Sequence, residues 1–129
     1  MNLLLDTHIF LWWILDDPHL GPLSRGLLAD GSNSLFWSAA SSWEVGIKYA
    51  LGRLPLPDRP SLFLAAQLSL NRVHPLPVRD DHAFKAAALP PLHRDPFDRM
   101  LVAQAQTELL TLVSLDEQVR QYDVPVLGD

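Results

Sequence analysis

Four acidic residues that lie far apart in the chain have the side-chain type needed to bind a divalent cation. They are Asp6, Glu44, Asp98 and Asp116. Carboxylate oxygens are hard ligands, and the chain has no cysteine, so this set predicts Mg²⁺ or Mn²⁺ rather than zinc. Such a cation activates water and stabilises the charge that develops when a phosphodiester bond is cleaved. Without a cation, four gathered carboxylates would repel one another and raise each other's pKa values.

Short apolar strands alternate with helices along the sequence, and this order predicts how the acids are positioned. We predict strands at 2–5, 34–38, 73–78, 111–115 and 124–127, and helices at 7–15, 22–30, 41–51, 60–71, 80–88, 96–109 and 116–122. Gly31 and Gly52 are expected to end the second and third helices. The strands lack alternation of apolar and polar residues, which is typical of a parallel sheet with helices on both faces. We therefore expect an α/β fold of three layers (α/β/α) with a central, mainly parallel sheet of four to five short strands.

The expected fold would bring the four acids to one edge of the sheet. In a parallel sheet, the carboxyl ends of the strands and the amino ends of the following helices share an edge, where ligands bind. Asp6 and Asp116 directly follow predicted strands, whereas Glu44 and Asp98 lie near the beginnings of helices. Ordinary structural roles remain open: Asp6 and Asp116 can cap the segments that follow them, and Glu44 can pair with Lys48 four residues later.

The stretch PLHRDPFDRMLVAQAQ, residues 91–106, contains two aspartates where a helix start needs only one. Pro96 suits the first helical position, which makes Asp95 the N-cap and Asp98 the third residue of the helix. Asp98 then heads an apolar stripe that continues with Leu101 and Val102, and a carboxylate facing inward needs a partner. We therefore assign the chemistry to Asp98 and the cap to Asp95, with Asp95 as a possible neighbour of the site.

Length and charge narrow the class of protein further. The 129 residues predict a single domain covering residues 1–129, and 48% hydrophobic residues fit a globular core. A net charge of −5 argues against extended binding of a nucleic-acid duplex. The apolar N-terminus is interrupted by Asp6 and His8 and lacks a basic leader, so we expect no signal peptide, no membrane segment and a cytoplasmic protein.

Three basic residues near the predicted site are candidates for contacts with substrate phosphates. They are Lys48, Arg94 and Arg99. Taken singly, each is best explained as a solvated charge or as the partner of a nearby acid. As a set they would offer the local phosphate contacts that an acidic protein otherwise lacks.

Aromatic residues and histidines are interpreted mainly as structural. We expect most of the four tryptophans in the core, with Trp12 or Trp13 as candidates for a dimer surface. The histidines show neither metal-binding spacing nor the order of a catalytic triad, so core or surface positions are the better interpretation. His93 is the one next to the predicted site.

Four segments together resemble the PIN-domain family, and within it the VapC-type toxins of bacterial toxin–antitoxin pairs. They are LLLDTH (3–8), SSWEVGIK (41–48), HRDPFDRMLVAQA (93–105) and LVSLD (112–116). The resemblance implies a PIN-like fold and an endoribonuclease dependent on Mg²⁺ or Mn²⁺, with Asp6, Glu44, Asp98 and Asp116 as catalytic and metal-binding residues. It also places Ser114 two residues before the last acid, and Thr7 follows the first, so both are candidates to support the site.

The same resemblance implies partners that the chain itself does not show. VapC-type proteins commonly form homodimers and are inhibited by a small antitoxin whose tail occupies the acidic groove. Two alternatives stay open: a catalytically silent PIN fold that serves as a protein-interaction module, and a receiver-like phosphoacceptor domain. The second alternative is disfavoured, because Asp6 has no adjacent acid and no lysine follows Lys85.

Overall fold

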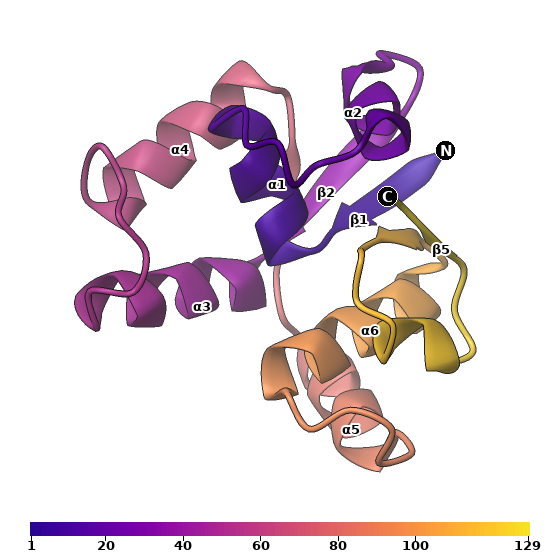
Figure 1. Cartoon of the computed structure of the whole chain (residues 1–129). Helices are drawn as coiled ribbons and strands as arrows, with labels where there is room; N and C mark the ends of the chain where they lie inside the picture. The colour runs from indigo at the N-terminus through magenta and orange to yellow at the C-terminus, as the bar shows by residue number, and fades with distance from the viewer.

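The computed structural model describes all 129 residues and contains one parallel five-stranded sheet (Figure 1). The strands are β1 (Asn2–Leu5), β2 (Ser34–Ser38), β3 (His74–Leu76), β4 (Thr111–Val113) and β5 (Val126–Leu127), in the order β3-β2-β1-β4-β5. All neighbouring strands pair in parallel. The chain extends the sheet from β1 first through β2 on one side and later through β4 on the other. This reversal opens a crevice at the carboxyl ends of the strands, next to β1.

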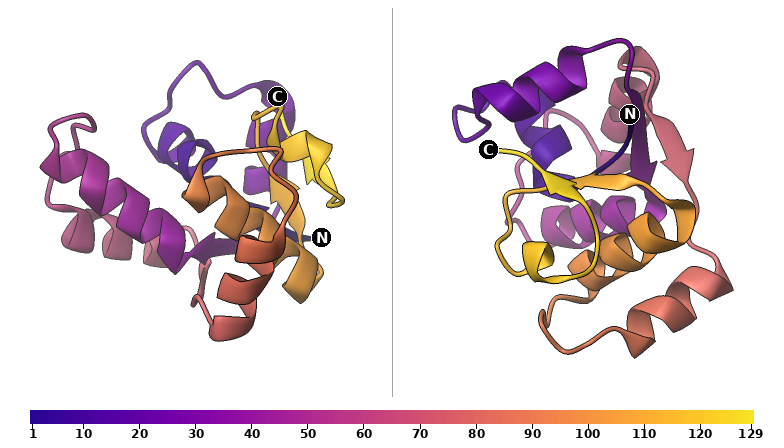
Figure 2. Two further views of the ribbon diagram at one scale, coloured as in Figure 1. Left: turned by 90° about the horizontal axis from the view of Figure 1, so that it is seen from below. Right: turned by 90° about the vertical axis from the view of Figure 1, so that its right-hand side faces the viewer.

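Helices cover both faces of this sheet. They are α1 (Thr7–Ile14), α2 (Pro22–Ala29), α3 (Ala39–Ala50), α4 (Pro60–Leu70), α5 (Asp80–Ala88) and α6 (Pro96–Glu108), followed by the 3₁₀ turn η1 (Val119–Gln121). Helices α1, α2 and α4 lie on one side of the sheet and α5 and α6 on the other (Figures 1 and 2). The predicted three-layer α/β fold is therefore confirmed. None of the helices is both long and apolar enough to cross a membrane.

Strand β1 shows why the strands are apolar without alternation. Leu3 and Leu5 pack into the core under α1 and α4, whereas Leu4 packs into the core under α5 and α6. All three side chains are fully buried. A strand covered on both faces has no side that can carry polar residues, so the apolar run is what a central parallel strand requires. Because β1 is held from both sides, Asp6, the next residue, is presented at a fixed point of the sheet edge.

Two helix boundaries differ from the predicted ones, because a capping side chain or the backbone conformation begins or ends the helix at another residue. Helix α3 begins at Ala39, two residues earlier than predicted, because the Ser38 hydroxyl accepts a hydrogen bond from the Ala40 N–H at 3.0 Å. Gly52 has a φ of +71° and ends that helix as expected. The prediction for Gly31 is wrong: α2 ends at Ala29 with extended backbone at the following residue, so no left-handed glycine is needed.

Near the carboxyl end, the predicted elements are shorter. Strand β4 stops at Val113, and the predicted helix at 116–122 is reduced to the 3₁₀ turn η1. The segment between them turns away from the sheet, because the Ser114 hydroxyl and the Asp116 carboxylate accept hydrogen bonds from backbone N–H groups two residues later. Side chains that bond their own backbone in this way compete with regular structure.

The end of α6 offers a test of backbone strain. Leu109 has φ 57° and ψ 48°, a left-handed conformation in which its side chain is 88% exposed. Glycine adopts this conformation without the steric cost that a branched side chain meets. We expect Leu109→Gly to raise the free energy of unfolding by about 1 kcal/mol, measured by urea denaturation.

The matched control is Leu70→Gly, at the last residue of α4, where the leucine is also exposed. Glycine within a helix costs up to about 1 kcal/mol, so this variant should lose stability. Equal changes in the two variants would contradict the assignment of strain to Leu109.

Candidate active site

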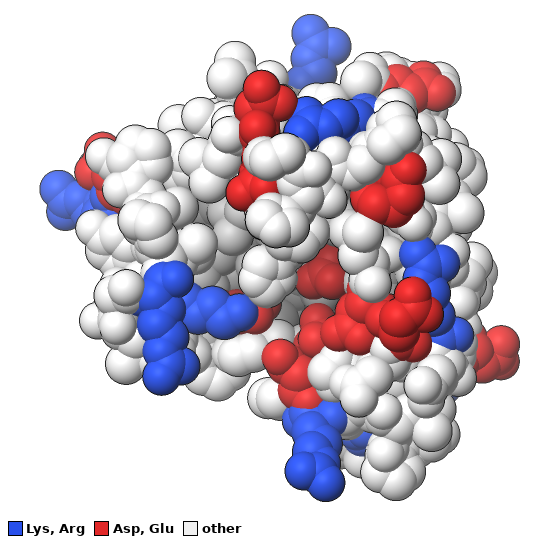
Figure 3. All heavy atoms as spheres, in the orientation of Figure 1, with Lys and Arg blue, Asp and Glu red and all other residues white.

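The four predicted acids line a single pocket at the carboxyl edge of the sheet. Its volume is about 430 Å³, and Asp6, Glu44, Asp98 and Asp116 all border it. The other lining residues are His8, Ile9, Trp12, Lys48, His93, Asp95 and Leu115. Figure 3 shows acidic side chains around a hollow in this face of the molecule, with basic side chains at its borders. The crevice that strand order creates is therefore the place where carboxylates from four distant segments meet.

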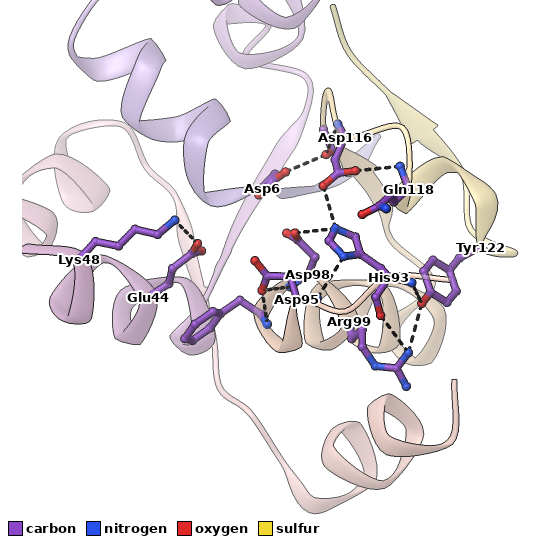
Figure 4. Close-up of polar contacts among 12 residues, drawn as sticks. Asp6, Glu44, Lys48, His93, Asp95, Asp98, Arg99, Asp116, Gln118 and Tyr122 are labelled. Carbon is purple, nitrogen blue, oxygen red and sulfur yellow. Dashed lines mark hydrogen bonds and ion pairs between the residues drawn. The ribbon is translucent and has the colours of Figure 1, made fainter. Parts of the chain in front are cut away.

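Asp6 and Asp116 are joined through one hydroxyl group. The Ser114 Oγ donates a hydrogen bond to Asp6 Oδ2 at 2.7 Å and accepts one from the Asp116 N–H at 3.1 Å (Figure 4). Asp6 occupies the N-cap position of α1, but its side chain makes no cap hydrogen bond. The carboxylate is 8% exposed, and burial raises its pKa although the Ser114 hydrogen bond acts in the opposite direction. Asp6 is thus a buried acid directed at the pocket rather than a helix cap.

This arrangement makes Ser114 a positioning residue, which gives a prediction. For the metal-dependent endoribonuclease that the sequence resemblance implies, we expect Ser114→Ala to lower the cleavage rate about 10- to 100-fold, because groups that orient the ligands of a metal site typically matter by that factor. The measurement is the single-turnover cleavage rate. Ser69→Ala, at an exposed position of α4, is the control and should cleave at the wild-type rate. Equal rates for the two variants would show that the Asp6 carboxylate needs no support.

Glu44 projects from the second turn of α3 and is only 4% exposed. Its Oε2 forms an ion pair with Lys48 Nζ at 2.6 Å. The pairing with the residue four positions later, which the sequence left open as an ordinary structural role, is therefore present. The pair nevertheless lines the pocket, and Lys48 remains 36% exposed. The pairing therefore does not remove Glu44 from the site, and it places one positive charge at the pocket's border (Figure 4).

At the start of α6, Asp95 caps the helix as the sequence predicts, and Asp98 lines the pocket. Asp95 Oδ1 accepts hydrogen bonds from the N–H groups of Phe97 (2.8 Å) and Asp98 (3.4 Å) and so caps the helix. Asp95 also lines the pocket. The pKa of Asp98 is raised to about 8, chiefly by burial and then by the neighbouring carboxylates, Asp6 first among them. The charge of Asp98 is therefore poorly compensated by the protein alone.

His93 connects two of the acids, which the sequence did not show. Its Nε2 lies 3.0 Å from Asp98 Oδ2 and 2.8 Å from Asp116 Oδ2, and its Nδ1 accepts a hydrogen bond from the Asp95 N–H at 3.1 Å. Since Nδ1 accepts, the proton lies on Nε2, which donates to Asp116 Oδ2 and lies within ion-pair distance of Asp98 Oδ2. Burial raises the pKa of Asp116, but the hydrogen bonds from His93 and the Gln118 N–H outweigh it and lower that pKa overall. Only the place of His93 within the stretch 91–106, near the predicted acids, pointed to this role.

The predicted phosphate contacts do not all reach the pocket. Arg94 is exposed beside it, whereas the guanidinium of Arg99 is directed at backbone carbonyls of the segment 86–93. Arg99 also donates to the Tyr122 hydroxyl at 3.2 Å. We therefore withdraw Arg99 as an RNA contact: its donors hold in place the segment that carries His93. Similarly, the Thr7 hydroxyl donates to Ser41 Oγ at 2.8 Å and so joins α1 to α3 instead of contacting Asp6.

The donor set of the pocket fits a hard divalent cation. Five carboxylates and one lysine line it, so its charge is strongly negative. The raised pKa values of Asp6 and Asp98 are the physical sign that this charge is poorly compensated by the protein. Carboxylate oxygens of Asp98 and Asp116 lie within 4.8 Å of each other, close enough to share one ion, and His93 lies between them as a hydrogen-bonding neighbour. Oxygen ligands of this kind suit Mg²⁺ or Mn²⁺.

Fold and pocket together define a parallel α/β protein of three layers with an acidic pocket where the strand order reverses. Its sequence matches the family model of the PIN domain over residues 3–125, and the chain belongs to the PIN-domain family.

Relatives of known identity and structure agree with this assignment. A segment of 63 residues is 38% identical to Ribonuclease VapC16 from Mycobacterium tuberculosis, and it covers 49% of this chain and 43% of that relative. The structure also resembles VapBC2 from Rickettsia felis bound to a DNA fragment from its promoter, with a TM-score of 0.73, 19% identity and full coverage of both chains. VapBC-1 from nontypeable Haemophilus influenzae gives a TM-score of 0.65 at 17% identity, over 99% of this chain and 98% of that one. The solved structures support the fold.

Proposed function

We propose that this protein is a Mg²⁺- or Mn²⁺-dependent endoribonuclease, the toxin of a toxin–antitoxin pair. The observation that carries the proposal is the convergence of Asp6, Glu44, Asp98 and Asp116 on one pocket. Four carboxylates in so small a volume repel one another and destabilise the folded state. Proteins tolerate such destabilisation at functional sites, and a bound cation would account for it here. The name of the matched relative, a ribonuclease, supports RNA as the substrate.

The residues of the pocket divide the work between binding the cation and placing the RNA. Asp6, Glu44, Asp98 and Asp116 would hold the cation, which when bound lowers the pKa of a water molecule and stabilises charge on the phosphate. Ser114 fixes the Asp6 carboxylate, and His93 fixes Asp98 relative to Asp116. These hydrogen bonds set the carboxylate positions before substrate arrives, so little reorganisation is needed during the reaction.

Positive charge at the border of the pocket would receive the RNA backbone. Lys48 lies at one side beside Glu44, and Arg94 is exposed next to the loop that carries His93. Two cations are few for a polyanion, which favours local contacts with a single strand over extended binding of a duplex.

The partners follow from the same charge distribution and from the complexes named above. VapBC complexes are among the similar structures, and we propose that an antitoxin places a basic segment over the acidic pocket. A homodimer and a cytoplasmic location, where the RNA substrate is found, belong to the same proposal.

The test is cleavage of an end-labelled single-stranded RNA panel by the purified protein. We expect cleavage with Mg²⁺ or Mn²⁺, none with EDTA, and recovery when the metal is restored in excess. The same RNA annealed into a duplex should be cut far more slowly. Binding of RNA without cleavage under every metal condition would contradict the proposal and favour the catalytically silent PIN fold.

A further inference from the structure

One wall of the acidic pocket is aromatic. His8 and Trp12 both line the pocket, and they project from α1 one helical turn apart. Their ring centroids are 5.6 Å apart at an interplanar angle of 46°. The indole of Trp12 also stacks on the imidazole of His19, at 5.4 Å and 20°. Three rings thus form a row that begins at the pocket, and His8, its first member, is exposed.

Trp12 differs from Trp13 and Trp37 in the bonding of its indole N–H. The indole N–H of Trp13 donates to Asn71 Oδ1 at 3.4 Å, and that of Trp37 donates to Ser42 Oγ at 2.8 Å. Trp12 is partly exposed and its indole N–H has no protein partner, so it faces the solvent of the pocket. Buried tryptophans usually find a partner for this group. The position of Trp12 is therefore not explained by core packing alone.

The far end of the row is held in a fixed position. The carboxylate of Asp17 lies 2.6 Å from His19 Nδ1 and also accepts the His19 N–H at 2.9 Å. Arg25 donates to the carbonyl oxygens of Asp17 and Leu20 and forms an ion pair with Asp16 at 2.8 Å. The loop after α1 is thus tied to α2. A preorganised aromatic row binds a planar ligand with little loss of conformational freedom.

An acidic RNA-binding protein needs a source of affinity other than charge. The chain carries a net charge of −5, and five carboxylates surround the pocket. Stacking of a base on an aromatic side chain adds affinity that does not depend on net charge and is available to every base. The His8–Trp12 wall lies beside Asp6, because all three residues line the same pocket. A base attached to the phosphate held at the acids lies within reach of this wall.

We propose that His8 and Trp12 bind the nucleobase adjacent to the cleaved phosphodiester bond and thereby position the RNA strand. The inference rests on the proposed function and deepens it, because it assigns a base-binding wall to the same pocket. The exposed Trp43 and the partly exposed Phe97, whose rings meet edge to face at 5.4 Å, form the rival platform. It lines a separate apolar depression, so it provides the internal comparison.

The experiment is a double-mutant cycle that combines removal of an aromatic ring from the protein with removal of a base from the RNA. A short single-stranded RNA that the wild type cuts is prepared intact and with an abasic ribose on either side of the cleaved bond. The specificity constant kcat/KM is measured for the wild type, Trp12→Leu, His8→Ala and Trp43→Leu. For the wild type, we expect the abasic change on one side to lower kcat/KM roughly 5- to 150-fold. For Trp12→Leu, kcat/KM on intact RNA should be lower than that of the wild type by a similar factor. The abasic change should then cause no further decrease in the kcat/KM of this variant.

His8→Ala removes an exposed ring, so it reports on the wall even if Trp12→Leu reduces stability, and it should weaken the response to the abasic change. Trp43→Leu should respond to the abasic change as the wild type does. If the wild type cuts RNA but Trp12→Leu and His8→Ala respond as it does, or if Trp43→Leu alone loses the response, the inference is overturned and the nuclease stands. Absence of any wild-type cleavage overturns the proposed function itself.

Discussion

Replacement of Asp98 by asparagine is expected to lower RNA cleavage by about three orders of magnitude while leaving the fold intact. The change keeps the size of the side chain and an oxygen that can accept from His93 Nε2, so local packing is preserved. In the proposed function it removes a negatively charged ligand of the cation, and such a cation would contribute several kcal/mol to stabilisation of the transition state. A loss of about 4 kcal/mol corresponds to about 10³-fold in rate.

The same substitution should stabilise the protein when no divalent cation is present. Asp98 is largely buried and lies among four other carboxylates, which is why its pKa is raised to about 8. A neutral amide avoids that repulsion, so thermal unfolding at pH 8 in EDTA should occur at a higher temperature than for the wild type. A change that reduces activity and increases stability is typical of a functional site.

The control for both measurements is Asp123→Asn. Asp123 is an exposed aspartate that does not line the acidic pocket, so cleavage and stability should both stay at wild-type values. An Asp98→Asn protein that cleaves RNA as fast as this control would show that Asp98 has no part in the chemistry. Comparison with Asp95→Asn then separates the two aspartates, since Asp95 also serves as the helix cap.

The second large effect is a loss of stability as the pH rises from about 5 to about 8 in the absence of divalent cations. The pKa of Asp98 rises from the ordinary 3.8 to about 8 on folding. Between these values the folded protein binds a proton that the unfolded chain does not bind, so folding becomes less favourable as the proton is removed. The stabilisation that comes from protonation of Asp98 in the folded state is complete below the ordinary pKa. It is lost as the pH rises through about 8. The expected decline is on the order of a few kcal/mol.

Divalent cations should reverse this dependence. A cation binds the folded, deprotonated carboxylates and stabilises the folded state by mass action. Urea denaturation at pH 5, 6, 7 and 8, with EDTA or with excess Mg²⁺, provides the measurement. In EDTA the midpoint should fall with pH for the wild type and fall much less for Asp98→Asn, and Mg²⁺ should flatten the wild-type curve. Parallel curves for the two proteins in EDTA would refute the assignment of the effect to Asp98.

Local rules account for the features that were predictable from sequence. The division between Asp95 and Asp98 depends on Pro96 and on hydrogen bonds that span two or three residues, and the structure shows those bonds. The gathering of four acids depended on the order of strands and helices, because a parallel sheet presents all its carboxyl ends at one edge. The roles of these acids in catalysis remain predictions, for which the variants above are designed.

Long-range contacts decided what the sequence could not show. Arg99 and Arg94 look alike as basic neighbours of the motif, but only the packing of α6 on α5 places backbone carbonyls around the Arg99 guanidinium. The role of His93 depends on Asp116, 23 residues away. The far end of the aromatic row, His19, depends on a loop that Arg25 holds in place, and Trp43, expected in the core, is 68% exposed.

The sequence by itself determined the alternation of elements, the cap of α6 and the edge at which the acids gather. Each of these follows from residue types and spacings within a few positions of the chain. The regular geometry of helices and strands then fixes the edge or face of an element on which each residue lies. Tertiary structure decided which carboxylates are compensated by neighbouring groups, that the Trp12 ring stacks on His19, and that the Arg99 guanidinium is hydrogen-bonded to backbone carbonyls. These outcomes depend on distances between side chains from separate elements, and spacing along the chain does not fix such distances.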